Sequence, residues 1–187
     1  EAWQGKTMNE FGTEILGEIG EAVKHYQDQV DYNLNLNYDT RSLVGDDYSN
    51  IKEKHYGNSD VDGPDSNHGT HVSGIIAAKR NNGIGMDGIA GDGNVKIMSV
   101  RTVPNGDERD KDVVNAIRYA VDNGAKILNM SFGKAYSPDK EEVWNAFKYA
   151  ADKGVLLIKA AGNDDLNIDT DLHFPTVFND KGDAVSN

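Results

Sequence analysis

The first 45 residues carry a helical pattern and then an alternating one. Between residues 13 and 31, apolar side chains recur every three to four positions with charged residues between them, which predicts an amphipathic helix. Gly17 and Gly20 weaken that helix. From 31 to 38, tyrosine and leucine alternate with asparagine, and this period of two predicts a half-exposed strand or an extended arm. Both segments are expected at the periphery of the fold.

From residue 68 onwards, helical and strand patterns take turns. Residues 68–79 (HGTHVSGIIAAK) are small and apolar, which predicts a buried helix. Three later apolar runs are too short for helices and predict strands, at 95–100, 125–132 and 154–162. Helical patterns at 113–121 and 143–151 separate them, and each is followed by a glycine stop signal, Gly124 and Gly154. This alternation predicts an α/β fold with parallel strands covered by helices.

Composition narrows the classes of function. The 187 residues, 37% of them hydrophobic, are enough for one domain that buries about 70% of its unfolded surface. A net charge of −12 would repel nucleic acid and anionic membranes, so neither is an expected partner. The absence of cysteine excludes disulfides and cysteine chemistry. No apolar run approaches the roughly 20 residues of a membrane helix, and the N-terminus lacks an initiator Met and a signal-peptide core, as expected for a mature piece or an excised segment.

Polar groups at the ends of the predicted strands are the first candidates for chemistry, because ligands of parallel sheets bind there. NMSFG (129–133) and AAGN (160–163) follow two of the runs, although Asn163 alone is typical of a turn. His68 and His71, three residues apart, share one face of the helix that begins the alternating region. Without a third ligand or a nearby Glu, zinc binding is disfavoured for this pair, and a structural histidine is the simpler interpretation.

Taken together, the motifs SNHGTHVSGIIAA, NMSFG and AAGN, in this order and spacing, resemble the subtilisin-like serine proteases, or subtilases. The resemblance runs from about Tyr48 to Asn163 and includes GIGMDGIAG, VKIMSVRTV and VVNAIRYAVDNGAKILNMSFG. Residues 1–45 match nothing general in the family and look like an insertion of the kind that some bacterial members carry. We therefore expect an insertion-like helical segment with an extended arm at 1–45 and a partial catalytic domain at 46–187.

The resemblance implies a role for particular residues. His68 would be the general base and then acid of acyl transfer, and His71 would be structural. The amide of Asn163 would donate to the oxyanion of the tetrahedral intermediate. An extended protein or peptide substrate would bind at the two strand ends, on Ser131, Phe132, Gly133, Ala160, Ala161 and Gly162.

The nucleophile and the third triad member are missing from the expected places. The family's serine stands in a GTSMA-type motif well beyond the oxyanion asparagine, yet only 24 residues follow Asn163, and none of the nine serines has that context. Asp39-Thr40-Arg41 is the nearest match to the aspartate motif, but Arg41 replaces a glycine and the preceding NLNLNY is too polar for a central strand. The sequence therefore predicts an internal fragment that is inactive alone.

The resemblance further implies a three-layer subtilisin-like fold with a mainly parallel sheet that lacks the aspartate strand and the serine helix. The missing strand would lie between those at 95–103 and 125–132. We expect these two strands to pair directly, or the gap to be filled by residues 31–38 or by another chain, so self-association through the incomplete sheet is a candidate.

Glycine spacing and acidic loops suggest other sites in the sequence. Gly83, Gly85 and Gly88 have the spacing of a dinucleotide-binding loop, but they follow a helix and precede a strand, which is the wrong context. Calcium, which many subtilases use, is the candidate cofactor for two acidic loops. One contains Asp60, Asp62 and Asp65, and the other contains Asp164, Asp165, Asp169 and Asp171. Neither loop has the ligand spacing of a known calcium loop, and no metal ligand is assigned. A non-catalytic peptide-binding or interaction module with the protease fold is the alternative function. The resemblance suggests a secreted or cell-envelope protein.

Overall fold

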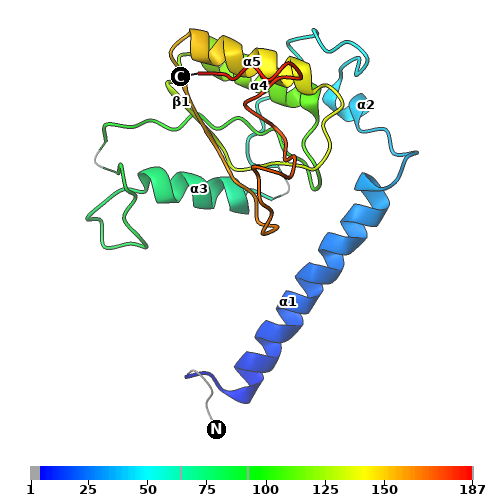
Figure 1. Ribbon diagram of the computed structural model, residues 1–187. Coiled ribbons are helices and arrows are strands. Elements are labelled where there is room, and N and C mark those ends of the chain that lie inside the picture. The colour runs from blue at the N-terminus through cyan, green and yellow to red at the C-terminus, as the bar shows by residue number, and fades with distance from the viewer. Residues whose placement is uncertain (1–4, 64, 92, 187) are drawn as a thin grey trace.

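A computed structural model describes residues 5–63, 65–91 and 93–186 of the chain (Figure 1). Its elements, in chain order, are α1 (Met8–Asp28), the π-helical turn η1 (Gln29–Asn33), α2 (Arg41–Val44), α3 (Asn67–Ala77), α4 (Asp110–Asp122), β1 (Ile127–Met130), α5 (Lys140–Asp152) and β2 (Leu156–Lys159). Among these described residues, no helix combines the length and the apolar composition that crossing a bilayer requires.

The core lies between α4, α5 and a parallel sheet of β1 and β2. The two helices pack side by side above the strands in Figure 1, and they bury their apolar stripes, with Phe147 only 1% exposed and Ala146 fully buried. Met130 and Val155 complete this core from the strand side. Burying such side chains is the main favourable contribution to folding. The predicted helices at 113–121 and 143–151, the strands after them and the α/β class are confirmed.

Glycine ends both core helices, as the sequence predicts. Gly124 and Gly154 have φ angles of 91° and 71°, in the left-handed region that glycine adopts without a steric penalty. Each turn leads directly into the next strand, where Ile127 pairs with Leu156 and Met130 with Lys159 in parallel register.

The predicted strand at 95–100 is wrong, because the structure leaves these residues in an irregular segment. Val95, Ile97 and Met98 are 42–45% exposed. A strand needs a neighbour for its backbone N–H and C=O groups, and the sheet of the described residues holds only β1 and β2. The expected direct pairing of 95–103 with 125–132 is therefore also wrong within one chain.

The predicted strand or arm at 31–38 is wrong as well, so this segment does not fill the gap in the sheet. The helical path of α1 continues through η1, where the N–H of Leu34 donates to the carbonyl of Gln29 at 2.8 Å. The side chain of Asn35 then donates to the carbonyl of Asp31 and accepts from the N–H of Asn37. Asparagine competes locally for backbone groups in this way, which favours turns over strands.

The amphipathic helix predicted at 13–31 is confirmed as α1, which projects from the rest of the chain in Figure 1. A capping box begins it, with Thr7 and Glu10 each bonding to the other's backbone N–H. Its apolar stripe stays in solvent, and Leu16, Val23 and Tyr26 are 62–71% exposed.

The helix predicted at 68–79 is confirmed as α3, but its expected burial is wrong. None of its residues is buried, and it does not belong to the α4–α5–sheet core. Residues 88–90 pack along its C-terminal turn, where the N–H of Ile89 donates to the carbonyl of Ile75 at 2.9 Å, but every residue of α3 stays at least partly exposed.

A cluster of charged groups fastens residues 41–56 to α4. Lys111, 1% exposed, bonds to Asp46, to the carbonyl of Asp47 at 2.6 Å and to Glu53 at 2.8 Å. Arg41 bonds to both carboxylate oxygens of Asp112 at 2.9 Å and to Asp46 at 2.6 Å. We call these residues, with Tyr56, the α4 ion cluster: Arg41, Asp46, Glu53, Tyr56, Lys111 and Asp112.

Burial and the contacts within the α4 ion cluster shift the pKa of Asp46, Lys111 and Tyr56. The hydrogen bond from Arg41 holds the pKa of Asp46 below its ordinary value, against the effect of burial. Burial alone would lower the pKa of Lys111, but its bonds to Asp46 and Glu53 raise it. Burial raises the pKa of Tyr56, whose hydroxyl donates to Asp112 at 2.8 Å. The folded state therefore favours the ionised forms of Lys111 and Asp46.

Candidate functional site

The parallel strands bring together the two segments that the sequence predicts to bind substrate. Met130 and Lys159 are the last pair in the register, and the N–H of Ala160 donates to the carbonyl of Met130 at 3.1 Å. Ser131–Gly133 and Ala160–Gly162 therefore leave the sheet side by side at its carboxyl edge. This is the edge at which parallel sheets bind ligands.

The imidazole of His173 packs against the glycines of both segments. A Cβ on Gly133 would overlap Cε1 of His173 and lie 2.9 Å from the carbonyl oxygen of Phe174. A Cβ on Gly162 would lie 3.5 Å from Nε2 of His173, and Gly162 also has a φ of 106°. The close approach at Gly133 and the positive φ at Gly162 explain why glycine stands at these two positions.

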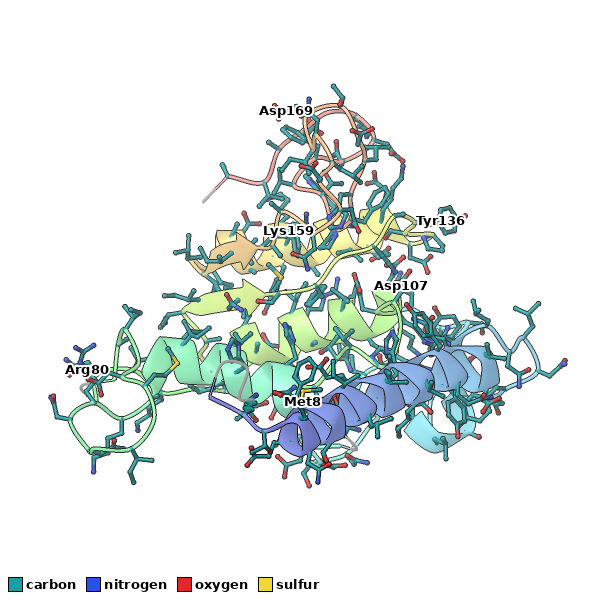
Figure 2. All side chains as sticks on the ribbon, turned by 90° about the horizontal axis from the view of Figure 1, so that it is seen from below. Met8, Arg80, Asp107, Tyr136, Lys159 and Asp169 are labelled. Carbon is teal, nitrogen blue, oxygen red and sulfur yellow. The ribbon has the colours of Figure 1, made fainter. Side chains whose placement is uncertain are left out.

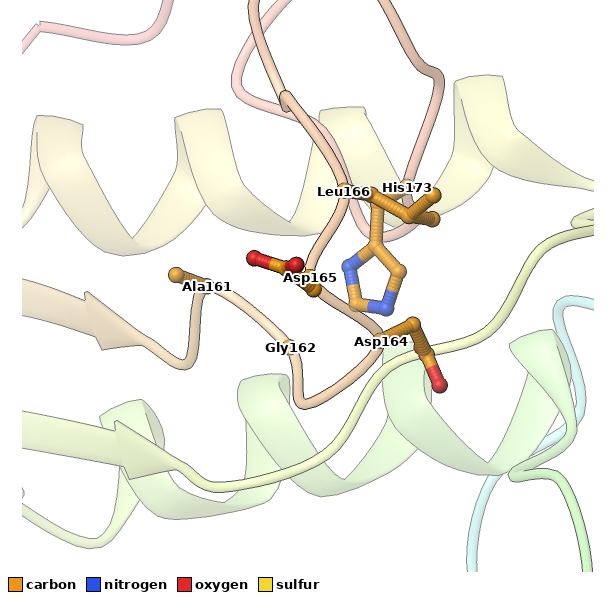
Figure 3. Close-up of a pocket in the computed structure, with 6 residues that line it drawn as sticks. All are labelled: Ala161, Gly162, Asp164, Asp165, Leu166 and His173. Carbon is orange, nitrogen blue, oxygen red and sulfur yellow. The ribbon is translucent and has the colours of Figure 1, made fainter.

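A cleft opens beside Gly162, and Figure 3 shows the ring of His173 in its wall. Its lining residues all belong to the turn and loop after β2: Ala161, Gly162, Asp164, Asp165, Leu166 and His173. Nδ1 of His173 lies 3.1 Å from the amine of Lys159, the last residue of β2. Burial lowers the pKa of Lys159. When this amine donates to Nδ1, the ring carries its proton on Nε2, beside the two glycines.

Lys134 connects the strand end to α4. Its backbone N–H and C=O pair with those of Phe174 at 2.9 and 2.8 Å, and its amine donates to the carbonyl of Glu108 at 2.7 Å. The same amine lies 2.7 Å from Oδ1 of Asp110, with both side chains at most 6% exposed. Three segments far apart in sequence thus meet at one lysine.

Glu108 lies beside this junction and is 3% exposed. Its Oε1 is buried and has no hydrogen-bond partner in the described part of the chain. Burial raises the pKa of this carboxyl group, against the favourable field of Lys134.

Sequence reasoning missed His173, Lys134 and Glu108. These residues form the site through contacts between segments that are distant in sequence, and none of them belongs to a recognisable sequence motif. The signal available was position: Lys134 directly follows the SFG segment, and His173 is the one histidine on the carboxyl side of both strands.

His68 and His71 lie in the first turns of α3, which begins after the N-cap Ser66, and both side chains are exposed. Asn163 is exposed in the turn after β2. In the view of Figure 2, α3 and the loop that carries Asp169 lie apart, whereas Figure 1 shows both on the same side of α4 and α5. The cleft at the strand ends has neither His68 nor Asn163 in its lining. The described contacts thus unite the predicted substrate-binding segments but do not bring the predicted base to them.

Asp39 has a structural role in the described fold. Its Oδ1 accepts from the N–H groups of Arg41 and Ser42 at 2.8 and 3.3 Å, the first two residues of α2, whose N-cap is Thr40.

The acidic loops do not assemble into a metal site in the described ranges, where no three His, Asp or Glu side chains converge on one point. Asp60 instead accepts from the N–H groups of Asp62 and Gly63 and pairs with Arg101 at 3.2 Å. Gly88 packs against the backbone of Ala78, and its carbonyl accepts from Arg80, so this glycine has a packing role at the end of α3.

Comparison with known proteins identifies the family. The model of the subtilase family of peptidases matches residues 25–184, most of the chain. The chain belongs to the subtilase family. The incomplete α/β fold of two parallel strands and their helices agrees with this subtilase membership. The search of solved structures gave no significant match.

Several curated serine proteases are similar to this subtilase segment. The chain is 44% identical over 85 residues to the thermophilic serine proteinase of Bacillus sp. (strain AK1), covering 44% of this chain and 21% of that protein. It is 35% identical over 133 residues to the major intracellular serine protease of Bacillus subtilis (strain 168), covering 70% and 41%. It is 38% identical over 136 residues to the halolysin-like extracellular serine protease Nep of Natrialba magadii, covering 69% and 24%. The chain thus spans 21 to 41% of the length of these relatives.

Proposed function

We propose that the chain is part of the catalytic domain of a serine endopeptidase that hydrolyses peptide bonds in protein or peptide substrates through an acyl-enzyme. The observation that carries the proposal is the strand pair β1–β2, which sets Ser131–Gly133 beside Ala160–Gly162 in a member of the subtilase family. In this proposal, the main chain of an extended peptide adds as a strand to the backbone of these two segments.

His68 and Asn163 carry the chemistry in this proposal. His68 accepts the proton of a serine hydroxyl while the serine oxygen bonds to the scissile carbonyl carbon. The displaced electron pair of the carbonyl moves to its oxygen, to which the Asn163 amide donates. The C–N bond then breaks, His68 gives its proton to the leaving amine, and water repeats the sequence to release the acid.

The chain alone is inactive under this proposal, because no serine in it is placed as the nucleophile. Of the two serines nearest the strand ends, Ser131 accepts from the side chain of Asn129 at 2.9 Å and Ser137 donates to Asp110 at 2.8 Å. We propose that the rest of the catalytic domain supplies the serine and the aspartate and brings α3 to the carboxyl edge of the sheet.

The test uses the full-length protein encoded by the reading frame that contains these residues. We expect a fluorophosphonate probe to label it and a peptide substrate to be cleaved, with His68→Ala abolishing both. Asn163→Ala should lower kcat by about 10²–10³-fold, a magnitude that comes from a member of this same family.

The matched control is His71→Ala, one turn along α3, which should retain most of the activity because this exposed side chain takes no part in the proton transfer. Labelling of the 187-residue chain by itself would contradict the proposal, and so would cleavage that survives His68→Ala.

A non-catalytic peptide-binding module is the second candidate. One observation favours it: the strand pair sets the two predicted substrate-binding segments side by side, but His68 does not line the cleft at the strand ends. The reading frame distinguishes the two. An upstream aspartate strand of the Asp-Thr-Gly type and a downstream Gly-Thr-Ser-Met-Ala type motif indicate the protease, and their absence indicates the module.

We also propose that the full-length protein is secreted or resides at the cell envelope. Two similar proteins are named as extracellular and one as cell wall-associated, whereas another is named as intracellular. Fractionation of cells and medium, followed by detection of the protein, tests this point, and a purely cytoplasmic pool would contradict it.

A further inference from the structure

We propose that Lys134 is a positioning residue for the substrate, acting through its buried ion pair with Asp110. This inference rests on the proposed peptidase function, because it concerns the segment that would bind the substrate main chain. Lys134 does not contact the substrate in this proposal. It fixes where Ser131–Gly133 lies relative to α4 and to the loop at 173–174.

The backbone of Lys134 fixes one side of this arrangement. Its two hydrogen bonds with Phe174 form an isolated antiparallel bridge directly after Gly133. That bridge holds His173 against the backbone of Gly133, with no room for a Cβ. A shift of Lys134 therefore moves the strand end and the wall of the cleft together.

The side chain of Lys134 fixes the other side. Its amine bonds to the carbonyl of Glu108 and to Oδ1 of Asp110, both at 2.7 Å. Asp110 in turn accepts from the hydroxyl of Ser137 and from the N–H of Asp139, both at 2.8 Å. The carboxylate thus holds the loop 134–139 to the first turn of α4 at three points.

Burial makes this pair a determinant of geometry. The side chains of Lys134 and Asp110 are 6% and 3% exposed, so separating the two would leave each charge buried without its partner. A buried pair of this kind often adds little net stability over an apolar pair of similar volume. It does penalise every arrangement in which its two segments are displaced. Misplacement of binding groups by about 1 Å can cost as much as 100-fold in reaction rate.

Lys111 is the matched control that the chain offers. Lys111 lies on α4 and, like Lys134, is buried and paired with an aspartate. Its partners Asp46 and Glu53, however, belong to the segment 41–56. A purely structural role for Lys134 predicts that replacing either lysine lowers stability and leaves substrate binding alone. The positioning role predicts that only the Lys134 variant alters substrate binding.

The experiment compares Lys134→Met, Lys134→Arg and Lys111→Met in the full-length protein, with KM and kcat for one peptide substrate and Tm for each variant. We expect Lys134→Met to lower kcat/KM by about 10- to 100-fold, with a rise in KM as part of that loss. Lys134→Arg keeps the charge and should recover most of the loss. Lys111→Met should lower Tm and leave KM unchanged.

If Lys134→Met does not fold, Asp110→Asn replaces it, because the asparagine keeps an acceptor for Ser137 and removes the charge. An unchanged KM in the folded variant would overturn the proposal, as would an equal rise of KM in Lys111→Met. A wild-type protein that cleaves its peptide while Lys134→Met keeps a normal KM refutes only this inference. A wild-type protein that neither cleaves nor binds peptide refutes the proposed function and this inference together.

Discussion

The carboxyl group of Glu108 shows how one residue can be held in an unfavourable state by the fold around it. It is buried beside Lys134, and one of its oxygens has no hydrogen-bond partner among the described residues. Burial raises its pKa, so the folded chain binds a proton here more tightly than the unfolded chain does. Above both pKa values the ionised carboxylate therefore destabilises the fold, and this cost disappears as the pH falls through the raised pKa.

Glu108→Gln should accordingly stabilise the chain at pH 7, because the amide has the shape of the carboxyl group and no charge. The expected gain is about 1.4 kcal/mol for each unit by which the pKa of Glu108 is raised. Urea unfolding at pH 7 and at pH 3 measures it, and the difference between wild type and variant should shrink at the lower pH. A loss of stability at pH 7 that persists at pH 3 would contradict the assigned cause.

At the scale of elements, glycine has opposite effects in two parts of the chain. Gly154 ends α5 with a φ of 71°, a conformation that other residues adopt only with strain. Gly17 lies inside α1, and apart from the nearby backbone of its own helix no atom lies within 4 Å of the position that its Cβ would take. The same substitution should therefore weaken one element and strengthen the other.

Gly154→Ala should lower the free energy of unfolding by about 1–2 kcal/mol, measured by denaturant titration. The control, Gly17→Ala, should increase the helix content seen by circular dichroism, because alanine favours a helix interior over glycine by about 1 kcal/mol. Equal effects of the two variants would show that the left-handed turn after α5 does not form.

The elements also show what the sequence can predict. The helices at α1, α4 and α5 follow from a local periodicity, because a helix satisfies its own backbone groups. The run at 95–100 has a strand-like composition, but a strand depends on a partner, and no partner is encoded nearby. The strand-end segments of the candidate site were predictable because parallel strands share one edge. Lys134 and Glu108 were not, because their contacts join residues 26 positions apart.

At the scale of the whole molecule, the α4 ion cluster attaches the N-terminal region to the core. Asp46 bonds to both Lys111 and Arg41, and its pKa lies below its ordinary value. A carboxylate of this kind stabilises the fold above the unfolded pKa, near 3.8, and the contribution is lost as the pH falls through the lowered value. The attachment of residues 41–56 should therefore fail only in strong acid.

Hydrogen exchange of residues 41–56 should thus be slow from pH 7 down to about pH 4, after correction for the intrinsic rate, and should accelerate below that. Asp46→Asn removes one carboxylate from Lys111 and Arg41, which keep Glu53 and Asp112, and should cost about 1–3 kcal/mol at neutral pH. The exposed pair Lys148–Asp152 offers a control, since Asp152→Asn should change stability by less than about 1 kcal/mol. Protection that is identical in wild type and Asp46→Asn would contradict the role of the cluster.

The α4 ion cluster also limits how this chain can be shortened. Deleting residues 41–56 would remove Asp46, Glu53 and Arg41 in a single step, and it would leave Lys111 and Asp112 on a helix surface shaped to receive them. A minimal version of the domain would have to recode both α4 positions at the same time. If the 41–56 segment is grafted onto a related scaffold, the recipient helix must present a lysine and an aspartate side by side, because the charges of the segment pair with them.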